Sequence, residues 1–224
     1  MTEGFAFTLG GAALLALPSG ALWWAAQRTL IVADLHFGKA ERLARRGGAL
    51  LPPYESRDTL LRLDTDISKM DALTVICLGD SFDDAEAVLG PDELSWLTRL
   101  MAGRTWIWIA GNHDPAPLDV GGTHLAQMEI EGLALRHIAT GIGTEVSGHY
   151  HPKAKLAGTA RPAFLIDGRH VIMPAYGTYT GGLWCTDPAL LPLMGPDALA
   201  VLTGQRTIVV PVHTKTALPR KRRA

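Results

Sequence analysis

The sequence predicts an α/β fold, followed by a region made mostly of short strands. Three observations lead to this prediction. Apolar segments typical of buried strands alternate with amphipathic segments of helical spacing in the first half. The second half contains short strand-like segments separated by turn signals. The chain has 224 residues, of which 47% are hydrophobic and 19% charged, as expected of one globular unit with a sizeable core.

The first half contains the strand and helix alternation. Pro18-Ser19-Gly20 interrupts an apolar stretch and predicts a turn between two strands. Leu60, Leu63 and Ile67 lie at helical spacing, and Pro91 is placed to begin a second helix. The expected elements are strands over residues 12–17, 21–25, 29–33, 73–78 and 105–110, and helices over 55–70 and 91–101.

The second half, after Pro117, is expected to be mostly β structure. Gly132 and Asp167-Gly168 are turn signals within it. The expected strands cover residues 127–130, 133–138, 144–148, 163–166, 170–173 and 207–213. We expect a single domain over residues 1–218 and a basic, disordered tail over 219–224.

The apolar stretch from Leu9 to Ala26 resembles neither a signal peptide nor a membrane span. No positively charged residue precedes it, and glycines together with Pro18 interrupt it. Only two cysteines are present, Cys77 and Cys185, which is not the pattern of a disulfide framework. We therefore expect a cytoplasmic protein without a membrane partner.

The overall charge does not indicate a protein that binds nucleic acid by bulk electrostatics. The net charge is −1 and the sequence pI is about 6.7. Local positive charge follows Asp34-Leu35-His36, where Lys39 and Arg42 occur. These two side chains either contact substrate phosphates or are ordinary solvated residues of a helix.

Three expected strands are each followed by polar side chains. Asp34 and His36 follow the strand over 29–33, Asp80 follows the strand over 73–78, and Asn112-His113-Asp114 follows the strand over 105–110. Open α/β sheets form their binding sites beyond the carboxyl ends of strands. We therefore expect these side chains to converge on one place.

The same site gains histidines from the second half. His149 and His151 have the period-two spacing that places both on one face of an extended segment. His137 lies in an expected strand, where it fits either a metal ligand or a core histidine. The candidate metal ligands are Asp34, His36, Asp80, Asn112, His137, His149 and His151.

Seven nitrogen and oxygen ligands are too many for one tetrahedral site, and they suit two adjacent divalent ions. Asp80 is the natural bridge between them. The two ligand carboxylates offset only half of the charge of two divalent ions, so the occupied site would attract an anion such as a phosphate ester. Asp83 and Asp84 are expected to support ligands or to cap the chain.

These motifs, in this order, resemble the signature of the calcineurin-like metallophosphoesterases. The resemblance covers residues 29–151 and includes Asp34-x-His36, Gly79-Asp80, Gly111-Asn112-His113-Asp114, His137 and Gly148-His149-x-His151. The segments 31–40 and 79–84 further resemble the DNA-ligase-associated metallophosphoesterases, which are DNA damage response endonucleases and occur alongside a helicase and a ligase.

The resemblance implies a sandwich of two mixed β-sheets flanked by α-helices. It also implies that Asp34, His36 and His151 hold one metal ion, that Asn112, His137 and His149 hold the other, and that Asp80 bridges them. His113 would be the general acid or transition-state stabiliser. Asp114 would orient His113 by accepting a hydrogen bond.

The function that we expect is DNA phosphodiester hydrolysis in repair with two divalent ions. Manganese is the favoured metal, and the ligand set also accepts iron, zinc or cobalt. DNA is the expected substrate, and a DNA ligase and a helicase are the expected functional partners, on the resemblance alone. Two alternatives remain open: a phosphoesterase for nucleotides or other small phosphoesters, and a non-catalytic metal-binding scaffold for repair partners.

Overall fold

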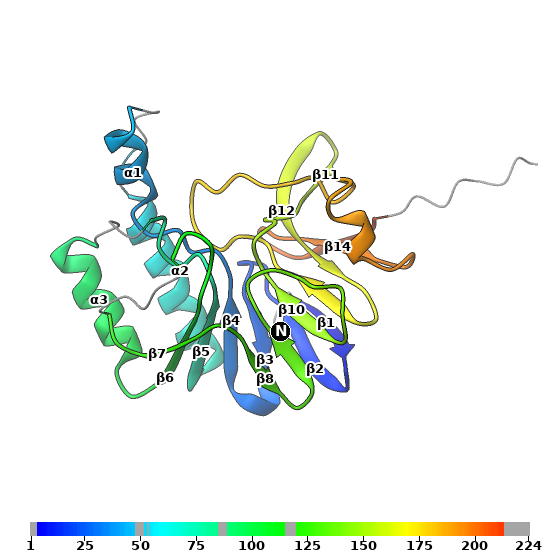
Figure 1. The fold of residues 1–224 in the computed structure, drawn as a ribbon, viewed down its shortest axis with the longest axis horizontal. Helices are drawn as coiled ribbons and strands as arrows, with labels where there is room; N and C mark the ends of the chain where they lie inside the picture. Colours follow the sequence, from blue (N-terminus) through cyan, green and yellow to red (C-terminus); the bar gives the residue numbers. More distant parts are fainter. Residues whose placement is uncertain (1–3, 48–51, 53, 85–88, 115–119, 213–224) are drawn as a thin grey trace, which may run out of the picture.

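The computed structural model is a sandwich of two mixed β-sheets with α-helices on one outer face (Figure 1). It describes residues 4–47, 52, 54–84, 89–114 and 120–212. His213 and the expected tail over 219–224 lie outside these ranges. The sandwich confirms the predicted fold class.

The first sheet has seven strands in the order β1-β2-β3-β4-β5-β6-β7. The strands β1 to β4 pair in antiparallel fashion, and β4 to β7 pair in parallel. Their bounds are β1 Phe5–Leu9, β2 Ala12–Ala16, β3 Leu22–Trp24, β4 Thr29–Val32, β5 Thr74–Leu78, β6 Thr105–Ile109 and β7 Thr123–Leu125.

The second sheet has the order β15-β14-β12-β13-β10-β9-β8, with β11 paired to β12. Within it, β13, β10 and β9 are parallel and the remaining pairs are antiparallel. The bounds are β8 Met128–Ile130, β9 Leu133–Leu135, β10 Glu145–Ser147, β11 Lys153–Leu156, β12 Thr159–Ile166, β13 His170–Ile172, β14 Leu199–Leu202 and β15 Ile208–Pro211.

Three α-helices lie on the outer side of the first sheet (Figure 1): α1 Lys39–Arg45, α2 Glu55–Met70 and α3 Pro91–Met101. Two short 3₁₀ segments cover Ala25–Gln27 and Leu191–Leu193. Pro91 is the first residue of α3, where its missing N–H has no helical partner to lose.

Successive side chains of each strand point to opposite faces of its sheet, and this alternation forms the layers of the fold. On β4, Leu30 and Val32 pack with α2 side chains such as Leu63, while Ile31 points to the space between the sheets. Inward side chains of both sheets, including Phe164 of β12, form the central core. This packing fixes the two sheets relative to one another and so sets where their loops meet.

The two long helices begin and end where the sequence predicts them, and the predicted strands are present with shifted ends. Four strands, β1, β7, β11 and β14, are additional. Helix α1 contains Lys39 and Arg42, which one of the two interpretations of that segment placed on a helix. In β1, Phe5 and Phe7 alternate with more exposed residues ahead of a Gly10-Gly11 turn, which is a strand signal at sequence level. The strand predicted over 133–138 ends at Leu135, so His137 lies beyond a strand end like the other candidate ligands.

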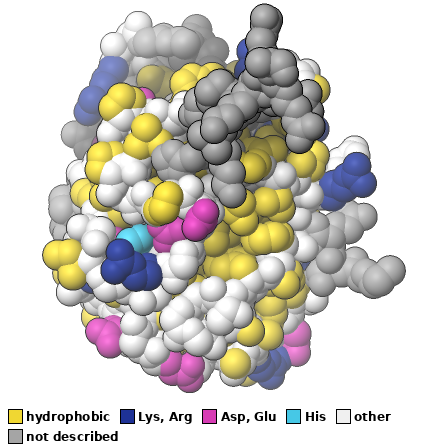
Figure 2. Space-filling view, turned by 90° about the vertical axis from the view of Figure 1, so that its right-hand side faces the viewer, with side chains coloured by type: hydrophobic (Ala, Val, Ile, Leu, Met, Phe, Trp, Pro, Cys, Tyr) yellow, Lys and Arg dark blue, Asp and Glu magenta, His cyan; other side chains and the backbone are white. Residues whose placement is uncertain are grey.

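Figure 2 shows the side of the molecule that lies at the right of Figure 1, where β1, β2 and β14 lie. In the face-on view of this side, hydrophobic side chains gather at the centre and Lys and Arg are scattered (Figure 2). Among the described residues, no helix is long and apolar enough to cross a membrane.

We expect the contact between α2 and the first sheet to dominate the stability of the helical layer. Leu63 is fully buried, whereas Leu61 on the same helix is 57% exposed. Leu63→Ala should lower the free energy of unfolding by about 2–5 kcal/mol, because it leaves a cavity against β4. Leu61→Ala should change it by less than about 0.5 kcal/mol. Urea unfolding of both variants measures the difference, and equal losses would contradict this packing.

Candidate metal centre

The candidate ligands lie where parallel strands of both sheets end. Backbone hydrogen bonds continue the β4 and β5 pairing into the loops, with His36 N donating to the Asp80 carbonyl at 2.9 Å. In the second sheet, Gly148 N donates to the His137 carbonyl at 2.9 Å. The loops that carry the motifs are therefore ordered extensions of the sheets.

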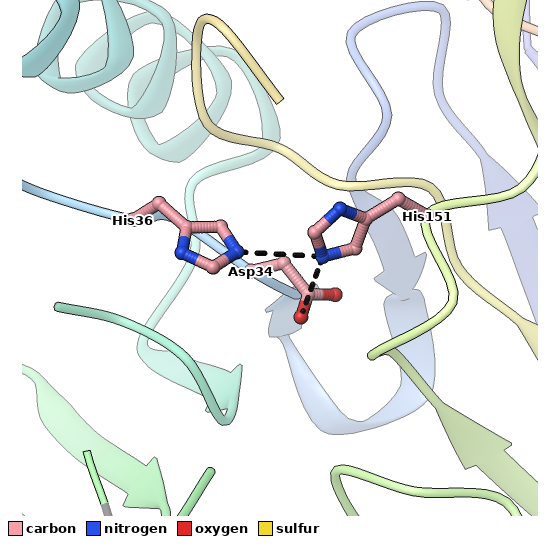
Figure 3. Close-up of side chains that lie close together, drawn as sticks. All are labelled: Asp34, His36 and His151. Carbon is pink, nitrogen blue, oxygen red and sulfur yellow. Dashed lines mark hydrogen bonds and ion pairs between the residues drawn. The ribbon is translucent and has the colours of Figure 1, made fainter. Parts of the chain in front are cut away.

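Asp34, His36 and His151 form the first cluster (Figure 3). Asp34 and His36 come from the loop after β4, and His151 comes from the facing loop before β11. His36 Nε2 lies 3.4 Å from His151 Nε2, and His151 Nε2 lies 3.2 Å from Asp34 Oδ1. Three ligand atoms from both sheets thus point at one spot.

Asp80, His137 and His149 form the second cluster, and Asn112 lies against it. His137 Nε2 is 3.4 Å from Asp80 Oδ2, 3.2 Å from His149 Nδ1 and 3.0 Å from Asn112 Oδ1. All seven candidate ligands therefore gather into two neighbouring groups. The assignment of individual ions, and of Asp80 as the bridge between them, stays a prediction.

The donor geometry fits metal ions. Two nitrogens bound tetrahedrally at 2.0–2.1 Å from an ion lie about 3.3 Å apart, close to the nitrogen distances in both clusters. The far ring atoms are also engaged: His137 Nδ1 is 2.8 Å from the Leu78 carbonyl oxygen, and His36 Nδ1 is 2.7 Å from Asp83 Oδ1. These partners place the protons on Nδ1 and leave Nε2 free to bind metal.

The electrostatics around His137 and Asp80 in the second cluster favour added positive charge, whereas burial and His137 lower the pKa of His149. Burial lowers the pKa of His137, but Asp80 and Asp34 outweigh burial and raise it. Burial likewise opposes ionisation of Asp80, yet His137 and the His113 amide hold the pKa of this carboxyl well below its usual range. The same carboxylates would stabilise a bound metal cation.

Five candidate ligands adopt the left-handed backbone conformation that L-residues rarely adopt. The φ angles are 54° for Asp34, 49° for His36, 46° for Asp80, 71° for His149 and 46° for His151. Such residues persist only where the surrounding structure enforces them, and they concentrate at functional sites. The loops are therefore shaped for the convergence of their side chains.

The glycines of the motifs lie where atoms of other loops come too close to leave room for a Cβ atom. A Cβ on Gly79 would lie 2.4 Å from His137 Nδ1, one on Gly111 would lie 2.2 Å from Asp80 N, and one on Gly148 would lie 2.5 Å from Asp34 Oδ2. Each of these glycines precedes a ligand. The motifs therefore contain glycines that are needed where loops come close together, as well as the candidate ligands.

Asp114 has a different role from the predicted one. Its carboxylate accepts hydrogen bonds from the backbone N–H groups of Gly111, Asp80, Ser81 and Phe82, at 2.7–3.1 Å. Among the described residues, the His113 ring nitrogen Nδ1 has the Asp83 carbonyl as its hydrogen-bond partner and not Asp114. Burial raises the pKa of Asp114 while the amides of Phe82 and Ser81 oppose that shift. Asp114 therefore holds the Asp80 loop, and the prediction that it orients His113 is wrong.

His113 is oriented by Asp83 instead. Its Nδ1 lies 2.8 Å from the Asp83 carbonyl oxygen, and its ring packs edge-on against His36 at 5.3 Å between centroids. The same aspartate carries a fully buried carboxylate that contacts His36. A carbonyl acceptor requires a proton on Nδ1, so Nε2 is the atom of His113 available to a substrate.

Lys39 and Arg42, predicted as substrate contacts, have Asp83 as their partner. Lys39 Nζ lies 3.7 Å from Asp83 Oδ1, and Arg42 Nε contacts Asp83 Oδ2. Burial opposes ionisation of Asp83, but His36 and Arg42 lower its pKa to about 2. These cations therefore neutralise a buried carboxylate beside the cluster, the supporting role expected for Asp83 at sequence level.

Residues 27–180 match the model of the calcineurin-like phosphoesterase family, so the chain belongs to this family of metal-dependent hydrolases. No curated protein matches the sequence significantly. Among solved structures, the chain is similar to the nuclease MPE of Pseudomonas putida, with a TM-score of 0.74 and 28% identity over 92% of this chain and 100% of that one. This similarity agrees with the resemblance to the DNA-ligase-associated members.

The glycine contacts predict a selective loss of metal. Gly79 and Gly103 have nearly the same φ, 76° and 73°, but a Cβ at Gly103 would meet nothing within 4 Å. Both alanine variants bear the left-handed backbone cost of about 1–2 kcal/mol. Only Gly79→Ala should also displace His137 and reduce bound metal, measured by elemental analysis after reloading. Equal metal content in the two variants would contradict the steric argument.

The Asp114 contacts predict a structural effect. Asp114→Asn replaces one acceptor oxygen by an N–H₂ group that faces backbone donors, so the free energy of unfolding of metal-free protein should fall by about 1–3 kcal/mol. Asp197→Asn, at an exposed loop residue, is the control. If Asp114→Asn unfolded like the wild type in urea, its carboxylate would not be what holds the Asp80 loop.

Proposed function

We propose that this protein is a metal-dependent phosphodiesterase that cleaves DNA, acts in DNA repair and uses two divalent ions, with manganese as the favoured metal. The observation that carries the proposal is the pair of adjacent histidine and carboxylate clusters with His113 beside them. A nuclease as structural neighbour supports the choice of DNA as the substrate class.

The ligand set contains few carboxylates, which suits an anionic substrate such as a phosphodiester. Asp34 and Asp80 are the carboxylates of the two clusters, and the other ligands are neutral when bound. When bound, two divalent ions supply a net positive charge for the substrate and lower the pKa of water to make a nucleophile near neutral pH. The two ligand carboxylates would offset only half of the charge of two divalent ions, and the neutral imidazoles would offset none of it.

In the proposed mechanism, His113 acts on the leaving group. The Asp83 carbonyl accepts from Nδ1, which fixes the ring and directs Nε2 away from Asp83. The side chain is partly exposed, unlike the buried ligand His36. In its protonated form His113 donates the Nε2 proton to the departing oxygen, a step that matters most when the leaving group is a poor one.

The test compares two diesters that differ in their leaving groups. Metal-stripped protein is reloaded separately with manganese, zinc or magnesium and assayed on bis-p-nitrophenyl phosphate and on single- and double-stranded DNA. We expect hydrolysis of both, with DNA cleavage falling steeply as salt rises because phosphate contacts release counterions. His113→Ala should keep its metal and lose DNA cleavage on the order of a hundredfold or more.

His124→Ala is the matched control, since His124 lies on β7 and stacks on Trp108 outside both clusters. It should cleave DNA like the wild type. Hydrolysis of the nitrophenyl diester with DNA left intact would favour small phosphoesters instead. A metal-loaded protein inert on both substrates would favour the scaffold alternative. Functional association with a DNA ligase or a helicase stays a prediction from the family resemblance.

A further inference from the structure

Trp184 differs from the other tryptophans in its exposure to solvent. The chain has six tryptophans, of which Trp23, Trp24, Trp106 and Trp108 are at most 8% exposed. Trp184 is 43% exposed. Tryptophan has a large flat ring that a fold usually covers, and it is enriched among the residues that dominate binding interfaces. An exposed ring of this size is therefore available to a partner that also has a flat face.

The backbone next to Trp184 pairs with the loop that carries candidate ligands of both clusters. Leu183 N donates to the Tyr150 carbonyl at 3.2 Å, and Tyr150 lies between the candidate ligands His149 and His151. This hydrogen bond joins main-chain atoms, so it does not depend on the side chains involved. The segment that leads into Trp184 is therefore held beside the candidate metal centre by the fold itself.

Trp184 lies close enough to the clusters to meet a strand bound there. Lys153 and Trp184 are bridged in parallel fashion, with Lys153 N donating to the Leu183 carbonyl and Cys185 N donating to the Lys153 carbonyl, both at 2.9 Å. Consecutive Cα atoms are about 3.8 Å apart and paired strands about 4.8 Å apart, so the Trp184 Cα lies within about 12 Å of the His151 Cα. A nucleic acid strand passes this distance in a few nucleotides.

Positive charge accompanies the exposed ring. Lys153 Nζ lies 4.8 Å from the centre of the Trp184 ring, within the range of a cation–π contact. Lys155 is exposed and shares a face of β11 with Lys153, because alternate residues of a strand point the same way. The acidic residue nearest to Trp184 in sequence, Asp187, accepts a hydrogen bond from the Ala189 amide. An aromatic surface beside two lysines fits a nucleotide, whose base stacks and whose phosphate is attracted.

We propose that Trp184 is a base-stacking residue, whose ring binds an unpaired base of the nucleic acid substrate a few nucleotides from the scissile phosphate. The inference rests on the proposed function and makes it more specific. Stacking uses the flat face that every base has, so the contact tolerates any sequence. A small phosphoester held at the clusters has no second base to place on Trp184. The residue therefore adds affinity for a strand without touching the reacting phosphate.

The test removes either the protein ring or the bases. The Kd of the full chain, freed of metal so that nothing is cut, is measured for a fluorescent single-stranded oligonucleotide and for an abasic chain of the same length, which keeps the phosphates. Trp184→Ala should raise the Kd of the oligonucleotide by about five- to a hundredfold, the range for loss of one base–aromatic stack. It should leave the Kd of the abasic chain unchanged. Trp184→Phe keeps a ring and should retain most of the affinity.

Cleavage by the metal-loaded protein supplies a second readout. A stack away from the reacting phosphate contributes equally to the bound substrate and to the transition state, so Trp184→Ala should raise KM for DNA while kcat stays the same. Leu156→Ala is the control. Leu156 is an apolar residue of β11 that is 37% exposed, and it lies on the opposite face of the strand from Lys153. This variant should match the wild type in both assays.

The outcomes separate the two proposals. If Trp184→Ala weakened binding of the oligonucleotide and of the abasic chain equally, or weakened neither, Trp184 would not be a stacking residue, and cleavage of DNA by the wild type would still support the nuclease function. If the wild type bound the oligonucleotide through Trp184 but cleaved DNA with no metal, the stacking role would stand and the nuclease function would fail.

Discussion

Burial of four carboxylates at one end of the sandwich is the constraint on which the rest of the site depends. Asp34, Asp80, Asp83 and Asp114 are at most 8% exposed, and like charges so placed are costly unless each is balanced. Three kinds of partner balance them: backbone amides for Asp114, the cations Lys39 and Arg42 for Asp83, and imidazoles together with single backbone amides for Asp34 and Asp80. The loops, their glycines and their strained residues follow from this arrangement.

The candidate ligands can be predicted from the sequence because the pattern that marks each of them lies within a few neighbouring residues. A polar residue directly after a buried strand is visible in the chain, and the order of the motifs identifies the set. The partners of Asp114 and Arg42 lie far away in sequence and depend on loop packing, so their roles could not be predicted. The short strands β7, β11 and β14 are likewise defined by their neighbours in the sheet, since three or four residues carry little periodicity.

Chemistry at the two clusters, as proposed, requires only a single phosphodiester, with His113 acting on its leaving oxygen. Selection of a nucleic acid polymer would require positive charge beyond the clusters. Because the overall charge is near zero, affinity for nucleic acid would depend on local cations rather than on a broad positive field.

The left-handed ligand residues have a consequence for how the centre acquires its metal. Asp34 accepts a hydrogen bond from the His149 amide at 2.9 Å, so one carboxylate joins the ligand loops of both sheets through a contact within the protein itself. A short peptide carrying the same motifs would have to adopt five disfavoured backbone conformations at once. Metal recognition would therefore be a property of the folded sandwich, which enforces these five backbone conformations.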